Sequence, residues 1–481
     1  MNGSPQNTSE RPGLLRGLGL WAAIAVVIGD TIGSGIFLVS SDMARLVGST
    51  ALVFTAWIFG GLVVLCGAFC YAELGATFPK AGGPYAYLTR GLGPLWGFLF
   101  GWMSAFLERP VAMATLAAGF VRFLGFVFPA VTAPLFTIHL WGGELLVTAA
   151  QPLAAFVVIA VTALNYLSVK MGGAIQLALT SIKVGTILLI VLGGVFFGAG
   201  HLSSAAPSAA IATHVSWAGT VIAILSALVP AMWAYNGFND LGHLGEEVIE
   251  PQKNIPRAIL LGLGTIGALY LLANVTYFRV LTFAEVAGSA HVASDAVRRF
   301  AGERGAIALT IAMAISALGA LHVVVLTGAR IPYAMARDGV FFKFAERLHP
   351  KLRTPSGSLV FLGTVAALLA LSGTYEQLYS LFVFALWIFF ALTAIALIRL
   401  RVTEPELARP FRAWAYPATP IVFLLAGVAL TVNLWTQRPI RSTLGILVIL
   451  AGVPFYYRWR ARSAPRSAVA ADIDVGSKRT D

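Results

Sequence analysis

The sequence predicts an all-α integral membrane protein with twelve transmembrane helices, two inverted sets of five and a final pair. Three observations support this prediction: few charges, long apolar runs, and two matched interruptions in those runs. Of the 481 residues, 58% are hydrophobic and only 11% are charged, whereas an ordinary soluble domain carries about 25% charged residues. The net charge of +12 would suggest nucleic-acid binding in a soluble protein. In a membrane protein basic residues instead mark the cytoplasmic side, so we expect no nucleic-acid partner.

Apolar runs of about 20 residues are long enough to cross the hydrocarbon core of a bilayer as helices. Such runs fill nearly the whole chain. We expect twelve spans at residues 18–47, 51–77, 92–122, 150–168, 174–199, 216–244, 258–283, 304–338, 357–373, 376–401, 418–435 and 440–457.

The apolar stretch 123–149 is broken by prolines and glycines, so we expect an external loop there, with a further span as the alternative. The small, polar and basic tail from Trp459 is predicted to be disordered. The expected organisation is a cytoplasmic segment 1–17, helices one to five in 18–199, helices six to ten in 200–401, helices eleven and twelve in 402–458, and a cytoplasmic tail 459–481.

Basic residues predict the orientation. Lys and Arg gather in the loops after the second, eighth and tenth spans and in the tail, whereas the loops 123–149 and 200–215 contain neither residue. By the positive-inside rule both termini are cytoplasmic.

Two of the predicted helices are interrupted. The first contains Gly-Asp-Thr-Ile-Gly-Ser-Gly at 29–35, and each glycine weakens a helix by about 1 kcal/mol relative to alanine. The sixth contains Asn236, Gly237 and Asn239 in mid-span. Each interruption opens a set of five helices, and because five is odd the second set runs in the opposite sense. Matched interruptions of this kind indicate the binding site of an inverted-repeat transporter; the alternative is close helix packing through small residues.

A broken helix at mid-membrane frees backbone groups that protein, water or a solute must satisfy. The N–H groups at Gly33, Ser34 and Gly35 favour an anion such as a carboxylate. The carbonyl groups near Trp233 and Ala234 favour a cation such as an ammonium group. An α-amino acid is the simplest solute that carries both charges on one carbon.

At these residues the chain resembles the amino acid–polyamine–organocation permeases, most closely the L-type branch of heteromeric-transporter light chains and its bacterial relatives. The similarity runs almost end to end. It is carried by residues 28–37, 71–87, 165–170, 182–183, 233–239, 246–247, 251–259, 409–412 and 416–417.

This resemblance implies a LeuT-like fold and alternating access. It implies that the backbone at Thr31, Ile32, Gly33, Ser34 and Gly35 binds the substrate carboxylate. It also implies that Trp233, Ala234 and Asn236 surround the ammonium group, with Asn239 and Tyr277 on the substrate side. Trp233 stands where relatives often have Phe, and Asn236 stands where they often have Asp or Gly, so the side-chain preference stays open.

Lys183 lies about nine residues into the fifth predicted helix, ~13 Å deep at 1.5 Å per residue. It should therefore point into the protein. In related transporters a lysine here occupies the space of a sodium ion and contacts the first helix break; a structural ion pair is the alternative. Asp30 is expected to polarise the site, to pair with Lys183 or to cap freed amides.

Other buried ionisable groups are expected to be structural. Glu108 and Arg109 are adjacent on a helix, so we expect them to face different partners. His322 is predicted to form a packing hydrogen bond. Glu73 and the pair Glu246–Glu247 are predicted to form ion pairs near the cytoplasmic face. The free thiols of Cys66 and Cys70 are expected to be reduced packing residues.

The sequence thus favours a sodium-independent transporter that exchanges neutral L-amino acids across an inner (plasma) membrane. Proton symport through a titrating Lys183 or Asp30 is an alternative. Transport of a cationic amino acid or polyamine is less favoured, because Asp240 is the one acidic residue near the sixth-helix break. A non-transporting amino acid sensor is a remote alternative.

No enzyme motif and no metal-ligand spacing are found in the sequence, so neither a cofactor nor a metal is expected. Eukaryotic members of the branch carry a Cys in the external loop after the third helix, through which a heavy chain is bonded. The corresponding loop here has none. We therefore expect no disulfide-linked heavy chain, and a monomer is compatible with the sequence.

Overall fold

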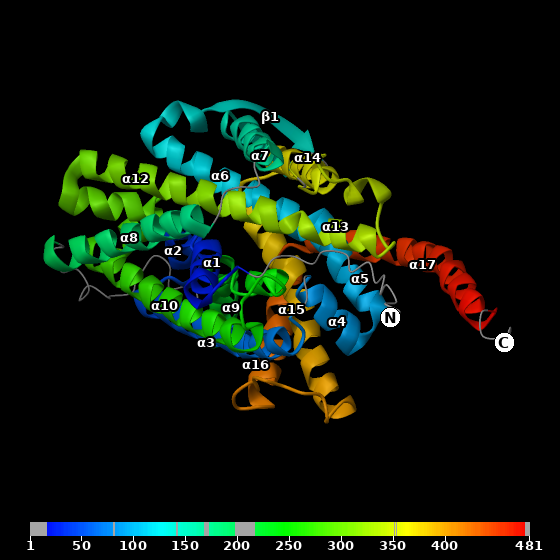
Figure 1. The fold of residues 1–481 in the computed structure, drawn as a ribbon. Coiled ribbons are helices and arrows are strands. Elements are labelled where there is room, and N and C mark those ends of the chain that lie inside the picture. Colours follow the sequence, from blue (N-terminus) through cyan, green and yellow to red (C-terminus); the bar gives the residue numbers. More distant parts are fainter. Residues whose placement is uncertain are drawn as a thin grey trace.

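The computed structural model describes residues 17–79, 82–140, 143–167, 173–197, 217–350, 352 and 354–476. These residues form a bundle of helices with one small β-hairpin (Figure 1). The helices before the hairpin are α1 (Leu20–Thr31), α2 (Gly35–Val47), α3 (Thr50–Thr77), α4 (Pro84–Leu92), α5 (Pro94–Met103), a π-helical turn η1 (Ser104–Glu108), α6 (Arg109–Val127) and a 3₁₀ turn η2 (Pro129–Thr132).

The remaining elements follow the hairpin strands β1 (Pro134–Leu140) and β2 (Gly143–Thr148). They are α7 (Ala150–Leu167), α8 (Gly173–Phe197), α9 (Trp217–Ala234), η3 (Asp240–Leu244), α10 (Pro251–Val280), α11 (Phe283–Gly288), α12 (Val292–Gly328), α13 (Arg330–Arg337), η4 (Lys343–Glu346), α14 (Ser356–Ser372), α15 (Tyr375–Thr403), α16 (Ala418–Gln437) and α17 (Pro439–Gly476).

Within the described residues, ten helices are long and apolar enough to cross a membrane. The count is eleven if α1 and α2, which bend by 42° across a short break, form one span. The shorter apolar helix α14 covers the stretch in which the sequence predicts the ninth span. An all-helical membrane architecture is therefore confirmed.

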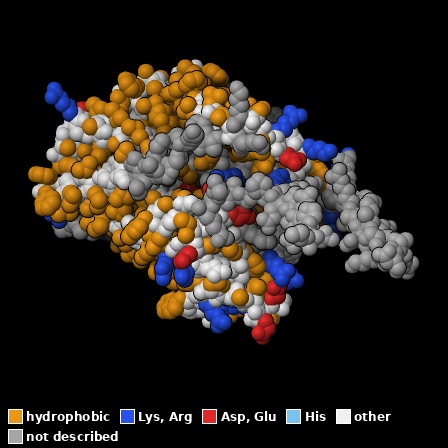
Figure 2. All heavy atoms as spheres, in the orientation of Figure 1, with side chains coloured by type: hydrophobic (Ala, Val, Ile, Leu, Met, Phe, Trp, Pro, Cys, Tyr) orange, Lys and Arg blue, Asp and Glu red, His pale blue; other side chains and the backbone are white. Residues whose placement is uncertain are grey.

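Large apolar side chains cover the outside of the bundle. Hydrophobic side chains spread over the region of α8, α10 and α12 in Figure 2, and Leu189 and Phe196 of α8 are 63% and 72% exposed. Such a surface would be an aggregation hazard in water, whereas lipid covers it in a bilayer.

After the span that ends at Val127, the described residues of the stretch 123–149 contain no further helix long enough to cross a membrane. The stretch holds the end of α6, the turn η2 and an antiparallel hairpin in which Thr137 pairs with Leu146 and Ile138 with Leu145. The strand pairing is irregular between Pro134 and Phe136, because proline has no N–H to donate to the ladder. The structure therefore has a hairpin where the sequence predicted a loop.

Helix α17 continues past Trp459 to Gly476, and its end extends away from the bundle in Figure 1. The structure thus assigns helix to 459–476, a stretch for which the sequence predicts disorder and which contains Pro465.

Glu73 connects the end of α3 to the end of α15 and to the segment that follows it. Its carboxylate accepts hydrogen bonds from Nε and Nη2 of Arg401 at 2.9 and 2.5 Å and from the backbone N–H of Ala413 at 2.6 Å. It also lies 3.5 Å from Nε of Arg409, and the Glu73 side chain is 1% exposed. This geometry confirms the predicted ion-pair role of Glu73.

We expect Glu73→Gln to lower the unfolding temperature in detergent by several degrees. Removal of one partner from a buried ion pair typically costs about 3–5 kcal/mol. Glu404→Gln is the matched control, because Glu404 pairs with Arg90 at 2.8 Å on the exposed surface, where such pairs contribute little. Equal unfolding temperatures for the two variants would contradict the assignment.

Candidate functional site

The two interrupted helices meet in the structure. Helix α1 ends at Thr31 and α2 begins at Gly35, while α9 ends at Ala234 and a turn leads to η3. A Cβ atom on Gly35 would lie 2.7 Å from Cα of Ala234. Gly237 has φ of +118°, and a Cβ atom there would lie 2.7 Å from the backbone nitrogen of Thr31. The contact therefore requires glycine at both positions.

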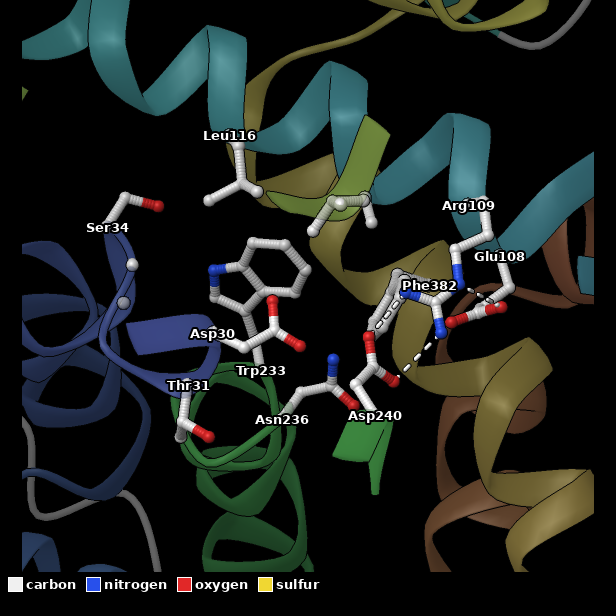
Figure 3. A pocket seen from close by; sticks show the side chains of 14 residues that line it. Asp30, Thr31, Ser34, Glu108, Arg109, Leu116, Trp233, Asn236, Asp240 and Phe382 are labelled. Atoms are coloured by element: carbon white, nitrogen blue, oxygen red, sulfur yellow. Dashed lines mark hydrogen bonds and ion pairs between the residues drawn. The ribbon is translucent and has the colours of Figure 1, made fainter. Parts of the chain in front are cut away.

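A cavity of about 30 Å³ lies at this contact (Figure 3). It is enclosed by the two breaks together with α6, α12 and α15. Its lining residues are Asp30, Thr31, Gly33, Ser34, Gly35, Glu108, Arg109, Ala112, Leu116, Trp233, Asn236, Asp240, Val324 and Phe382. A space of this size holds about one or two water molecules.

Most of the residues predicted to bind a solute line this cavity, namely Thr31, Gly33, Ser34, Gly35, Trp233 and Asn236, and so does Asp30, which was expected to polarise the site. The other four predicted residues do not line it. Ile32 is fully buried, and Ala234 packs on Gly35. The Asn239 amide donates to Oδ1 of Asp240 at 3.0 Å, and the Tyr277 hydroxyl donates to the Ile36 carbonyl at 3.3 Å.

Several polar atoms of the cavity wall have no hydrogen-bond partner among the described residues. They include Oδ2 of Asp30, Oγ1 of Thr31 and Oδ1 of Asn236. Helix α2 also starts without a side-chain capping hydrogen bond at Ser34. Buried polar groups are normally paired. These groups therefore offer acceptors to an ammonium group on one side and N–H donors to a carboxylate on the other.

Tyr270 of α10 joins the two breaks, and sequence reasoning missed it. Its hydroxyl donates to the carbonyl of Thr31 at 3.2 Å and to the carbonyl of Ala234 at 2.9 Å. These are the last residues of the two half-helices, where carbonyls lose their helical partners; the Thr31 carbonyl also accepts from the N–H of Gly33 at 2.9 Å. The sequence offered no signal for this role, because it arises from packing between distant segments.

Tyr375, the first residue of α15, was also missed. Nε1 of Trp233 donates to its hydroxyl at 2.9 Å, and its hydroxyl lies 3.0 Å from Oγ of Ser34. Tyr375 thus links both interrupted helices to α15 beside the cavity.

Lys183 reaches the first helix break as predicted. Its ammonium group donates to the carbonyl of Gly29 at 2.5 Å, and the residue is 1% exposed. The described contacts include no hydrogen bond between Lys183 and Asp30, so pairing of these two residues is not observed.

Arg109 forms the centre of a buried charged cluster. Its Nη1 and Nη2 donate to Oδ2 and Oδ1 of Asp240 at 2.5 and 2.8 Å, and Nη2 lies 3.1 Å from Nε2 of His243. Nε lies 3.2 Å from Oε2 of Glu108, which accepts a hydrogen bond from Ser104 at 2.5 Å.

The prediction that Glu108 and Arg109 face different partners is wrong in part, because the two side chains are in contact. The π-helical turn η1 ends at Glu108, and its wider ring of i→i+5 hydrogen bonds turns less per residue than an α-helix. The predicted second partner does exist for Arg109, in Asp240.

His322 and Glu247 have the structural roles predicted for them. Nδ1 of His322 lies 2.9 Å from the Asn165 amide nitrogen. Glu247 pairs with Arg330 at 3.1 Å. Cys66 and Cys70 are free thiols.

Comparison with known proteins identifies the family of the chain. The profile of a family described as amino acid permease matches residues 18–454. The chain belongs to the amino acid permease family. This permease is 30% identical to the b(0,+)-type amino acid transporter 1 of Homo sapiens, over 94% of the chain and 89% of the relative. It is 30% identical to the Asc-type amino acid transporter 1 of Mus musculus, over 94% and 83%. It is 29% identical to the serine/threonine exchanger SteT of Bacillus subtilis, over 95% and 99%.

We expect Tyr270→Phe to reduce amino acid uptake by reconstituted permease about tenfold or more. The substitution removes the hydroxyl that donates to the Ala234 carbonyl and one of two donors to the Thr31 carbonyl, and a buried carbonyl left without a donor costs about 1–3 kcal/mol. Tyr277→Phe is the matched control, because it removes a hydroxyl from the same helix that bonds outside the cavity. The role of Tyr270 would be refuted by equal uptake in the two variants.

Proposed function

We propose that this permease exchanges neutral L-amino acids across a plasma membrane by alternating access, without sodium. The observation that carries the proposal is the meeting of two broken helices at a buried cavity. On one side lies the uncapped start of α2 at Gly35, and on the other lie the unpartnered oxygens of Asp30 and Asn236. A zwitterion with both charges on one carbon fits that pair of environments.

The relatives support this substrate class. Their printed names describe amino acid transporters, and one is named a serine/threonine exchanger. The plasma membrane is proposed from the bacterial relative and from the multi-pass architecture.

We infer twelve spans, with α14 counted among them and α1 and α2 forming one broken span. In this arrangement helices one to five and six to ten form a LeuT-like inverted repeat within 18–199 and 200–401. The two breaks open the two halves, as inversion requires. The lack of Lys and Arg in the loops 123–149 and 200–215 supports cytoplasmic termini.

Alternating access follows from the size of the cavity. A space of about 30 Å³ is too small for an amino acid, so its walls must separate before a substrate enters. Tyr375 holds Ser34 and Trp233 together on the side of α15. On the side of the N-terminal segment, the N–H groups of Gly17 and Leu18 donate to the carbonyl of Glu247 at 2.9 Å each. The two sets of contacts form the outer and inner gates of the proposed transport cycle.

Lys183 is the proposed substitute for a sodium ion. Its ammonium group binds the Gly29 carbonyl at the end of the first half-helix, where freed carbonyls favour a cation. Because this cation belongs to the protein, its position does not depend on the sodium concentration.

The proposal is tested in proteoliposomes loaded with unlabelled serine or left empty. We expect labelled serine to enter loaded vesicles at least tenfold faster than empty ones, at equal rates in sodium and in potassium buffer. Uptake into empty vesicles driven by an inward proton gradient would contradict exchange and indicate proton symport. Saturable serine binding without flux would indicate a sensor.

We further expect Lys183→Ala to abolish exchange, because the break loses its cation. Lys183→Arg, which keeps the charge, should retain more activity than the alanine variant. Exchange by Lys183→Ala at the wild-type rate would show that the ammonium group is dispensable. Uptake by Lys183→Ala is measured at 0 and at roughly 100 mM sodium, close to the ionic strength of ordinary assay buffers. Uptake that returns only with sodium would show that a sodium ion replaces the lost ammonium group.

A further inference from the structure

Four charged side chains line the cavity, and they are unevenly placed. Asp30 lies at the first helix break and Asp240 follows the second, whereas Glu108 and Arg109 reach the cavity from η1 and α6 on its other side (Figure 3). In the proposed site the helix breaks bind the amino and carboxyl groups common to all α-amino acids. The side chain of a bound amino acid would then point toward the end of the cavity formed by Glu108 and Arg109.

The arginine at this end is held on all sides. Both terminal nitrogens bind the carboxylate of Asp240, Nε contacts Glu108, and Nη2 contacts His243. Gly328 of α12 lies against its stem, because a Cβ atom there would be 3.1 Å from Cδ of Arg109. The side chain is 3% exposed, so solvent does not screen these contacts.

The carboxylates outnumber the guanidinium. Asp30, Glu108 and Asp240 all line the cavity, but Arg109 is the one cation in its described wall. Without Arg109, the carboxylates of Asp240 and Glu108 would face the cavity with no cation to pair with. A buried carboxylate in that state binds a cationic group strongly.

We propose that Arg109 sets the specificity of the permease by occupying the place of a cationic substrate side chain. The inference rests on the proposed amino acid site and adds the feature that excludes substrates. A bound lysine or arginine would bring a second cation to carboxylates whose bonds are already taken. A neutral side chain meets no such repulsion.

The test compares two competitors of nearly equal shape, arginine and its neutral analogue citrulline, against labelled serine uptake. In wild-type permease we expect citrulline to compete at least tenfold better than arginine. In Arg109→Met this ratio should fall at least tenfold, because the freed carboxylates accept the substrate guanidinium. A ratio unchanged by Arg109→Met, or equal competition by both compounds in the wild type, overturns the proposal.

Asp240→Asn is the reciprocal variant. It leaves the Arg109 guanidinium without its bidentate partner, so the preference for citrulline over arginine should increase. If the ion pair were only structural, the two substitutions would change the citrulline-to-arginine ratio in the same way. Changes of opposite sign show that the charge of Arg109 determines which substrate binds. Should Arg109→Met fail to give a monodisperse peak in detergent, the Asp240→Asn ratio decides: a ratio that falls or stays constant overturns the proposal.

The same experiment separates this inference from the proposed function. Absence of wild-type uptake for serine and other neutral amino acids would overturn both. Normal serine uptake with a citrulline-to-arginine ratio unaffected by either variant would overturn the role of Arg109 and leave the proposed exchange intact.

Discussion

The site depends on one contact, the one between two helices that stop in the middle of the bundle. Each half-helix leaves backbone groups unpaired, and in a membrane protein no bulk water is present to satisfy them. The glycines at 35 and 237 let the two backbones approach to within van der Waals distance. The hydroxyl of Tyr270 then binds the last carbonyl of each half-helix. Three of the atoms left unsatisfied at the breaks, Oδ2 of Asp30, Oγ1 of Thr31 and Oδ1 of Asn236, belong to residues that line the same small cavity.

Two buried cations stabilise this arrangement in different ways. Lys183 binds a carbonyl at the end of α1, so it compensates for the broken helix itself. Arg109 binds Asp240 and Glu108 across the cavity, so it compensates for acidic side chains. Each charge is almost fully buried, and burial without a partner would be costly. We infer that the first cation keeps the site in shape and that the second selects what enters it.

The contacts around the cavity also explain how a closed site can open. Tyr375 bonds to Ser34 and Trp233, one residue from each break. The N-terminal segment bonds to Glu247 beyond the sixth-helix break. Both links are a few hydrogen bonds between groups that water can also satisfy, and each such bond contributes only about 1 kcal/mol net. They can be exchanged for water one side at a time, whereas the apolar packing of the bundle persists.

The sequence by itself determined the membrane architecture and indicated which residues meet at the candidate site. Long apolar runs and glycine-rich interruptions are local signals, because bilayer thickness and helix propensity act on neighbouring residues. Lys183 could be placed for the same reason: a charge so deep in an apolar run must turn inward.

Only the tertiary structure decided how the site is completed. Tyr270 and Tyr375 meet the breaks across 239 and 341 residues, and no local pattern encodes such a meeting. The contact of Glu108 with Arg109 depends on a π-turn, and the partner of Arg109 lies 131 residues away. The charge that we propose selects the substrate is therefore visible in the sequence as a residue, but its role exists only once distant helices have packed together.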